Sequence, residues 1–461
     1  MTRKPRIAII GAGITGLAAA CWLEEHGFCD YDVFEASGRA GGKICTYDTD
    51  GFVIEGGPDS YLARKTRMTD FIRRIGLEDD LTYNHRGSAF VLKQGRLHET
   101  PKQAVLGIPT DLDLFSQTTL LSEEGKARVV KEQRIPRVVK DGGDISVGTF
   151  FRTRFGDEMV DVLIEPLLGG IYGGNIDELS MKATFPVFLT LEETYGSVIK
   201  GLQETRTKSD TTKKQGLFLT VRSGLLSVVA AASQSLRKDA LHLNTVVTAI
   251  DKTESGTYRI SFDGKDACVY DACIVTTPPK QAAALFVNRT PFSYVENMEA
   301  TSCATVALTF CDEQVNNTHE GTGFVVARGG DEVITACTWT DQKWPHTSRE
   351  GYTLLRAYVG RPEDESIVDA SDEAIVTAVL SDLKKVMEIK GAPLFYKVTR
   401  FKQAMPQYKV GHVEEVTMFY ERMAKMYPRV HVVGAAFQGV GLPDCVVQGE
   451  EAAKELVHEE S

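Results

Sequence analysis

The first 35 residues contain the pattern that most constrains the fold. An apolar stretch at 6–10 runs into Gly11-Ala12-Gly13-Ile14-Thr15-Gly16, a run of small and apolar residues follows, and a second apolar stretch ends at Glu35. This order of strand, glycine turn, helix, strand and acid is that of a dinucleotide-binding βαβ unit. A glycine-rich turn in some other α/β protein is the alternative.

Each residue of this pattern has an expected task. Gly11 permits the turn, Gly13 lets backbone amides approach a pyrophosphate, and Gly16 lets the helix pack on the strand. The start of the helix offers free N–H groups and the positive end of a dipole to the phosphates. Glu35 would accept hydrogen bonds from a ribose.

Composition limits the remaining choices. The chain has 461 residues, 43 % of them hydrophobic and 25 % charged, which fits two or three domains or one large interleaved one. The net charge of −11 argues against nucleic acid as a partner. No run reaches the ~18–20 apolar residues of a membrane span, and the first strand leaves no room for a signal peptide, so we expect a cytoplasmic protein. Nine scattered Cys without a CxxC pair predict reduced, mostly buried thiols and no metal.

Two further glycine pairs lie close behind the first motif. Residues 39–43 read Arg-Ala-Gly-Gly-Lys, a turn typical of FAD enzymes of the amine-oxidase type, in which Arg39 and Lys43 add charge opposite a pyrophosphate. A solvated basic turn is the alternative. Residues 56–60 read Gly-Gly-Pro-Asp-Ser, which suits backbone against a flat ring. We expect Pro58-Asp59 to open a helix that carries Arg64 and Lys65.

The rest of the chain divides by its local pattern. Residues 105–215 have helical spacing, residues 216–290 return to alternating strands and helices, and residues 295–400 are rich in strands. We therefore predict an α/β fold with a discontinuous nucleotide-binding domain (1–85, 216–290 and 401–461). A substrate domain on a mixed sheet (86–104 and 291–400) and a helical domain (105–215) complete it.

The last glycine loop, at 434–441, joins a buried strand to a helix that begins near Pro443. The start of that helix suits a partial negative charge such as the pyrimidine edge of a reduced flavin. An ordinary strand-to-helix turn is the alternative. In the middle of the chain, residues 169–174 hold four glycines, for which a ligand close to the backbone and a helix kink are equally good interpretations.

Together these stretches resemble one family over residues 5–455. The segments GAGITGLAAA, FEASGRAGGK, GGPDSYLARK, LIEPLLGGIYGG, ITACTWTDQKWPH, AMPQYKVGH and GAAFQGVGLPDC are similar to those of the bacterial porphyrinogen oxidases of haem synthesis. The soluble Gram-positive type, the coproporphyrinogen III oxidase branch, is the nearest match. In that family the helical domain is membrane-binding-like, so a peripheral membrane contact stays open here, as does a transient protein partner from the haem pathway.

The resemblance implies bound FAD, no metal, and O2 as the acceptor. Its FAD contacts fall on the following positions: Gly11, Ala12, Gly13, Ile14, Thr15, Gly16, Glu35, Ala36, Lys43, Gly57, Pro58, Asp59, Ser60, Val247, Val440, Gly441 and Leu442. Phe401 stands where the family usually has Trp, so the aromatic wall remains while an indole N–H is lost.

The implied reaction is the six-electron oxidation of coproporphyrinogen III to coproporphyrin III, with three H2O2 released. A bridging CH2 of the porphyrinogen gives a hydride to flavin N5, and the protein mainly supplies orientation. We expect Lys65, and less strongly Arg64, to anchor a propionate, and Gly169, Ile171 and Tyr172 to line the pocket, although a core position is an equal alternative for Ile171 and Tyr172.

Several alternatives remain from the sequence. Protoporphyrinogen IX oxidation is the same chemistry with two propionates instead of four. A flavin amine oxidase or carotenoid desaturase would share only the nucleotide half. A non-catalytic tetrapyrrole-binding protein that retains FAD belongs to a different class. His346 and His412 suggest a general base, but no carboxylate partner is identifiable for either ring, and a structural role is the simpler interpretation.

Overall fold

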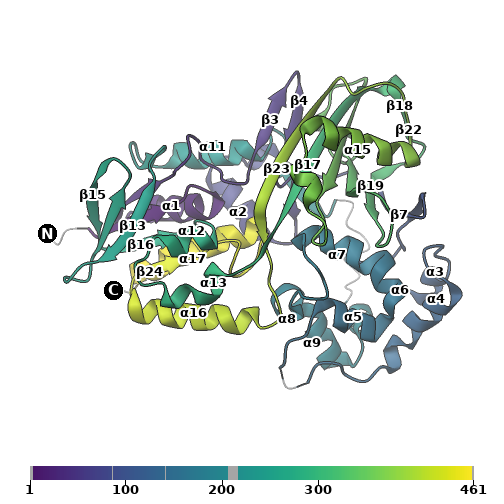
Figure 1. Ribbon diagram of the computed structural model, residues 1–461, viewed down its shortest axis with the longest axis horizontal. Helices are drawn as coiled ribbons and strands as arrows, with labels where there is room; N and C mark the ends of the chain where they lie inside the picture. Colours follow the sequence, from purple (N-terminus) through teal and green to yellow (C-terminus); the bar gives the residue numbers. More distant parts are fainter. Residues whose placement is uncertain (1–3, 86, 141, 206–215, 459–461) are drawn as a thin grey trace.

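The computed structural model describes residues 4–458 except 86, 141 and 206–215. Figure 1 shows three regions: a sheet with helices beside both termini, a second sheet with long strands, and a lobe of short helices below it. The long strands β17 (Ala300–Cys311) and β23 (Phe395–Pro406) run between the regions.

The first region is built on a five-stranded parallel sheet, in the order β12-β2-β1-β16-β24. Its strands come from widely separated parts of the chain: β1 (Arg6–Ile10), β2 (Asp30–Phe34), β12 (Leu241–His242), β16 (Ala272–Val275) and β24 (Val430–Val432). The expected return of the chain to the nucleotide-binding sheet after residue 216 is therefore observed. The predicted domain boundaries themselves stay a prediction.

Alternation along β1 separates the two cores of this sheet. Ile7 and Ile9 face a cluster that includes helices α1 (Ile14–His26), α2 (Thr66–Arg74), α11 (Leu225–Ser235) and α17 (Leu442–His458). Ala8 and Ile10 face the opposite cluster, with the antiparallel sheet β13-β14-β15 (Val247–Lys252, Tyr258–Phe262 and Lys265–Tyr270) and helix α16 (His412–Met426). Because both faces are covered, every residue of β1 after Arg6 is buried.

The second region is a seven-stranded sheet in the order β23-β17-β21-β20-β19-β7-β8. Its other strands are β21 (Tyr352–Val359), β20 (Ile334–Trp339), β19 (Gly321–Val326), β7 (Ser88–Lys93) and β8 (Arg96–Glu99). Only β19 and β7 pair in parallel among these described strands, so the prediction of a mixed sheet is confirmed. Helix α15 (Asp372–Val386) packs into the same core.

The helical lobe runs from α3 to α10. It contains α3 (Leu112–Ser116), α4 (Glu123–Val130), α5 (Val147–Phe155), α6 (Asp157–Met159), α7 (Glu165–Tyr172), α8 (Met181–Thr184), α9 (Pro186–Tyr195) and α10 (Val198–Thr205). A π-helical turn at Val160–Ile164 leads into α7. The buried Arg154 guanidinium, held by Glu132 and Glu192 at 2.5 Å each, ties this lobe together.

Two local predictions were wrong. Pro58-Asp59 opens no helix: the chain forms the short strand β5 (Tyr61–Leu62) against β11 (Phe218–Val221), and α2 begins only at Thr66. Of the nine free cysteines, four are buried, so they are not mostly buried.

The last part of the predicted helical domain, 206–215, lies outside the described residues, and residues 203–205 belong to α10. Within the described part of the chain, every helix is too short or too polar to cross a bilayer.

Candidate cofactor and substrate site

The glycine turn between β1 and α1 has the predicted geometry. Gly11 has a φ of +103°, which favours glycine, and a Cβ on Gly16 would lie 2.0 Å from the Gly11 carbonyl oxygen. A Cβ on Gly13 would meet nothing within 4 Å, so the space beside the start of α1 is open. Gly13 is also the N-cap residue of α1 and, as a glycine, has no side chain to accept a hydrogen bond from the first-turn amides. The first turn of α1 therefore offers its amides to an anion.

Glu35 and the 39–43 turn lie against this glycine turn. The Glu35 carboxylate accepts from the Ala12 N–H at 2.9 Å, and the Gly41 N–H donates to the Ala12 carbonyl at 2.8 Å. The Arg39 guanidinium donates to the carbonyls of Gly42 and Ile44 within its own turn, and its charge opposite a pyrophosphate stays a prediction. Lys43 donates to the Ala404 carbonyl, and burial lowers its pKa.

The glycine pair at 56–57 is required by close packing. A Cβ on Gly57 would lie 2.1 Å from the Lys43 carbonyl oxygen and 3.5 Å from the ring of Phe401, and one on Gly56 would strike Thr399. The Phe401 ring therefore lies close to this segment, and its role as an aromatic wall for the cofactor stays a prediction. The Arg356 guanidinium donates to the Gly57 carbonyl and anchors the segment to the seven-stranded sheet.

Asp59 joins that anchor through its side chain. Its carboxylate lies 3.3 Å from the Lys343 ammonium and 3.6 Å from the Arg356 guanidinium, and the Ser60 hydroxyl donates to it at 2.7 Å. Burial acts to raise the pKa of Asp59, but the two cations and the hydrogen bonds outweigh it and hold that pKa well below its usual range. Asp59 is thus a fixed anion.

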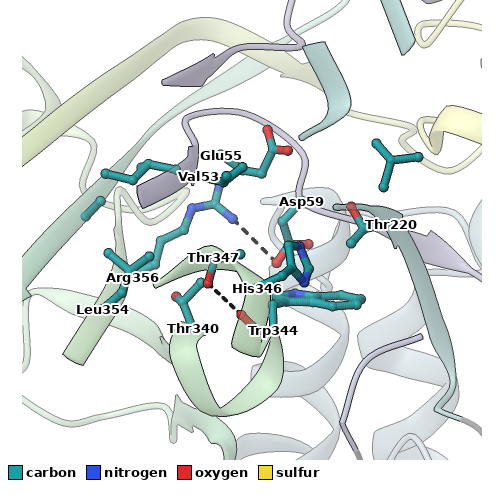
Figure 2. A pocket seen from close by; sticks show the side chains of 13 residues that line it. Val53, Glu55, Asp59, Thr220, Thr340, Trp344, His346, Thr347, Leu354 and Arg356 are labelled. Carbon is teal, nitrogen blue, oxygen red and sulfur yellow. Dashed lines mark hydrogen bonds and ion pairs between the residues drawn. The ribbon is translucent and has the colours of Figure 1, made fainter. Parts of the chain in front are cut away.

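Beside Asp59 lies a small cavity lined by residues of β4 (Phe52–Glu55), of β11 and of the seven-stranded sheet (Figure 2). Its volume of about 20 Å³ has room for about one water molecule. Glu55, Arg356, Trp344 and His346 are among the residues that line it. Burial raises the pKa of Glu55 to about 7, although the Leu225 N–H and the Thr46 hydroxyl both donate to it. Burial also lowers the pKa of His346.

The start of α17 brings the predicted flavin and substrate residues together. Lys65 precedes α2 and donates to both Asp444 oxygens, at 2.6 and 2.7 Å, and Asp444 lies in the first turn of α17 beside Gly441 and Leu442. Arg64 is exposed and makes no ion pair or hydrogen bond with any residue that the structure describes. The stronger predicted cation is therefore already paired, and the weaker one is free.

The glycines of 169–174 divide into two kinds. Gly173, with a φ of +58°, ends α7, and a Cβ on Gly174 would lie 2.0 Å from the Gln407 amide oxygen. A Cβ on Gly170 would meet nothing within 4 Å, and one on Gly169 would meet only the Glu165 carboxylate, at 3.8 Å. Gly169 and Gly170 therefore leave room for a ligand, whereas Gly173 and Gly174 are required by the local backbone conformation and packing.

Ile171 and Tyr172 point to different surroundings. Ile171 is 44 % exposed, whereas Tyr172 is buried in the core of the helical lobe, with its ring 6.0 Å from that of Tyr408. Burial and, less strongly, the charge of Asp444 raise the pKa of Tyr172 to about 12. Tyr172 therefore belongs to the core of the helical lobe.

The remaining predicted residues lie as follows. Val247 begins β13 and packs against the core that contains Ile10. Val440 packs against the helical lobe. His412 is buried, with both ring nitrogens in hydrogen bonds, to Tyr294 and to the Phe437 carbonyl, which supports its structural interpretation. Sequence reasoning missed Arg356, Lys343, Asp444 and Tyr408. Three of them lie within segments that carry the family resemblance: Lys343 in ITACTWTDQKWPH, Tyr408 in AMPQYKVGH and Asp444 in GAAFQGVGLPDC.

Comparison with known proteins identifies the class. Residues 14–457 match the flavin-containing amine oxidoreductases, and the chain belongs to this family of flavoenzymes. Its cofactor is FAD.

Individual relatives narrow the class further. The chain is 45 % identical to the coproporphyrinogen III oxidase of Bacillus subtilis and 43 % identical to that of Staphylococcus aureus, in each case over 98 % of this chain and at least 98 % of the relative. A crystal structure from Exiguobacterium sp. 255-15, assigned provisionally to the protoporphyrinogen oxidases, has 40 % identity and a TM-score of 0.90 over 100 % of this chain and 99 % of that one. The predicted resemblance and fold class are confirmed.

The residues present fit FAD at both ends. The open space at Gly13 and the uncapped start of α1 suit the pyrophosphate, and Glu35 lies where the ribose would follow. The Gly57 segment, Phe401 and the start of α17 suit the ring system. The individual FAD contacts stay a prediction.

Proposed function

We propose that the protein oxidises coproporphyrinogen III to coproporphyrin III, with O2 as the electron acceptor and three H2O2 as by-product. The observation that carries this proposal is the pair of relatives named coproporphyrinogen III oxidase, at 45 and 43 % identity over nearly full length. Bound FAD supplies the hydride-accepting N5 and the reaction with O2.

The gathering of side chains at the start of α17 supports the proposal. Arg64 and Lys65 are cationic and exposed, and Lys65 reaches Asp444 one residue after Pro443. Carboxylates of an acidic macrocycle would be attracted to these cations at the mouth of the site. Gly169 and Ile171, on α7, present open space and an exposed apolar side chain that suit a flat apolar ring.

In this proposal the protein orients its substrate and does little acid–base chemistry. Arg64 and Lys65 hold propionates, Phe401 and the Gly57 segment hold the flavin ring, and pyrrole N–H protons leave to solvent. His412 is unsuited to a general base because both of its nitrogens are already hydrogen-bonded.

The test is steady-state oxidation of both porphyrinogens by the FAD-loaded enzyme in air. We expect a higher kcat/KM for coproporphyrinogen III and three H2O2 per porphyrin formed. A higher kcat/KM for protoporphyrinogen IX would replace the proposal by its nearest alternative, which the provisional assignment of the Exiguobacterium structure favours. Absence of turnover with either substrate would favour a tetrapyrrole-binding protein.

A further inference from the structure

The segment before α17, residues 433–441, is held from three directions by buried side chains. Gln448 of α17 accepts from the Gly434 N–H at 3.1 Å. Tyr408, two residues beyond β23, donates to the Ala435 carbonyl at 2.6 Å and accepts from the Gly439 N–H at 3.0 Å. Hydrogen bonds thus fix this loop at both of its ends.

His412, the first residue of α16, holds the middle of the same loop. Its Nε2 lies 2.9 Å from the Phe437 carbonyl oxygen, and its Nδ1 lies 2.9 Å from the Tyr294 hydroxyl. A carbonyl only accepts, so Nε2 carries the hydrogen and Nδ1 accepts from Tyr294. Burial lowers the pKa of His412, in keeping with this neutral form.

The two rings form one unit. Tyr408 and His412 stack with centroids 3.9 Å apart and planes 11° from parallel, and they are 1 and 2 % exposed. The loop itself is glycine-dependent: Gly439 has a φ of +122°, and a Cβ there would lie 2.8 Å from the Asp444 Cβ. Two stacked rings therefore hold a backbone that has little intrinsic preference for its shape.

We propose that Tyr408 and His412 are positioning residues that fix the start of α17 against the FAD ring system. Neither side chain needs to touch the cofactor. They act through the carbonyls of Ala435 and Phe437 and the amide of Gly439, and so set where Val440, Gly441 and Leu442 lie. This inference rests on the predicted placement of the flavin at the start of α17.

The test compares Tyr408→Phe with Tyr420→Phe in the full-length protein. Tyr420, on α16, contacts Phe437 through its ring, but its hydroxyl makes no hydrogen bond with the residues that the structure describes. Tyr408→Phe removes the hydroxyl that pairs a partly buried carbonyl and a partly buried amide, so we expect FAD affinity to fall about tenfold or more, with a lower flavin midpoint potential. Tyr420→Phe should change neither quantity.

A second pair of variants keeps the inference testable if Tyr408→Phe fails to fold. The Gln amide in His412→Gln can still reach the Phe437 carbonyl with an N–H donor, whereas His412→Leu cannot. We expect His412→Gln to retain most of the FAD affinity that His412→Leu loses. Lower thermal stability with unchanged FAD affinity and potential, in Tyr408→Phe or in His412→Leu, would show a merely structural role and overturn the inference.

A crystal structure of the FAD-loaded enzyme distinguishes failure of the predicted flavin placement from failure of the positioning role alone. A flavin ring away from residues 440–442 would overturn its predicted placement, and the inference with it. A ring at these residues, together with unchanged affinity and potential in Tyr408→Phe and His412→Leu, would overturn only the positioning role.

Discussion

Two helices, α1 and α17, begin where the cofactor is expected, and their first turns differ in charge and in hydrogen bonding. At α1 no side chain caps the first turn, no acidic residue lies in it, and the space beside Gly13 is open. At α17 the first turn carries Asp444, whose charge is matched by Lys65, and buried rings hold the preceding loop. The start of α1 suits the phosphates, whose negative charge is fixed. The start of α17 suits the flavin ring, whose charge changes during the reaction.

A third helix start shows the ordinary arrangement. At α11 the buried Glu55 accepts from the Leu225 N–H at 2.6 Å, so the protein's own carboxylate satisfies the helix start. At α1 no side chain of the described residues accepts from the first-turn amides. The nearby Glu35 carboxylate accepts instead from the Ala12 N–H, just before the helix. The first-turn amides of α1 are therefore available to an anion, although other helices of the described chain, such as α2 and α16, also begin without a side-chain cap.

The largest expected effect is a loss of folding stability when a side chain is placed at Gly16, in the first turn of α1. In Gly16→Val the Cβ would meet the Gly11 carbonyl at 2.0 Å, a backbone clash that we expect to cost roughly 4 kcal/mol or more. In Gly441→Ala the Cβ would meet only the end of the Asp444 side chain at 2.9 Å, and the loss should stay within about 1 kcal/mol. Thermal unfolding of both variants measures the contrast.

Gly13→Ala is the matched control, since its Cβ has open space. We expect an unchanged unfolding temperature without cofactor but weaker FAD binding. Unchanged FAD affinity would contradict the placement of the pyrophosphate.

The next largest effect is on the pH dependence of stability, and it comes from Glu55 at the start of α11. The folded state raises the Glu55 pKa from 4.5 to about 7 and so binds its proton more tightly than the unfolded chain does. Stability from this group is therefore complete at low pH and is lost as the pH rises from about 4.5 to about 7, by roughly 3 kcal/mol.

Glu55→Gln should remove that part of the pH dependence. Unfolding temperatures of wild type and variant at pH 5 and pH 8 measure it, with the exposed Glu313→Gln as control. An equal decline in wild type and Glu55→Gln would contradict this account of the cap.

A smaller effect concerns the charges at α17. Asp444→Asn removes a negative charge from the first turn, so it should favour the reduced flavin and raise the midpoint potential by about 20 mV, equivalent to about 1 kcal/mol for two electrons. Lys65→Met should lower the potential by a similar amount, and the double variant should lie near wild type. Potentials measured by anaerobic dye equilibration test this, and identical values in all four proteins would place the flavin elsewhere.

The smallest expected effect is on substrate binding. Arg64→Ala removes the unpaired cation, and we expect KM for coproporphyrinogen III to rise about three- to tenfold with kcat unchanged. Arg67→Ala is the control, because its guanidinium is held by Glu450 at 2.9 Å. Lys65→Ala is measured beside them, and unchanged KM and kcat in that variant would remove Lys65 from the propionate site.

The sequence predicts the first helix start far better than the second. The residues of the βαβ unit are contiguous, and each has a local steric reason. At α17 the partners are distant: Lys65 pairs with Asp444, and Tyr408 reaches Ala435 and Gly439. Only tertiary structure brings them together. The helix expected to open at Pro58-Asp59 is absent for the same reason, because distant Lys343 and Arg356 engage the Asp59 carboxylate.

The most direct test of the central claim is anaerobic mixing of the FAD-loaded enzyme with coproporphyrinogen III, followed in a stopped-flow spectrophotometer. We predict complete bleaching of the flavin absorbance band, with its recovery when O2 is admitted. A flavin that stays oxidised while the tetrapyrrole binds would contradict the account and leave a binding protein in its place.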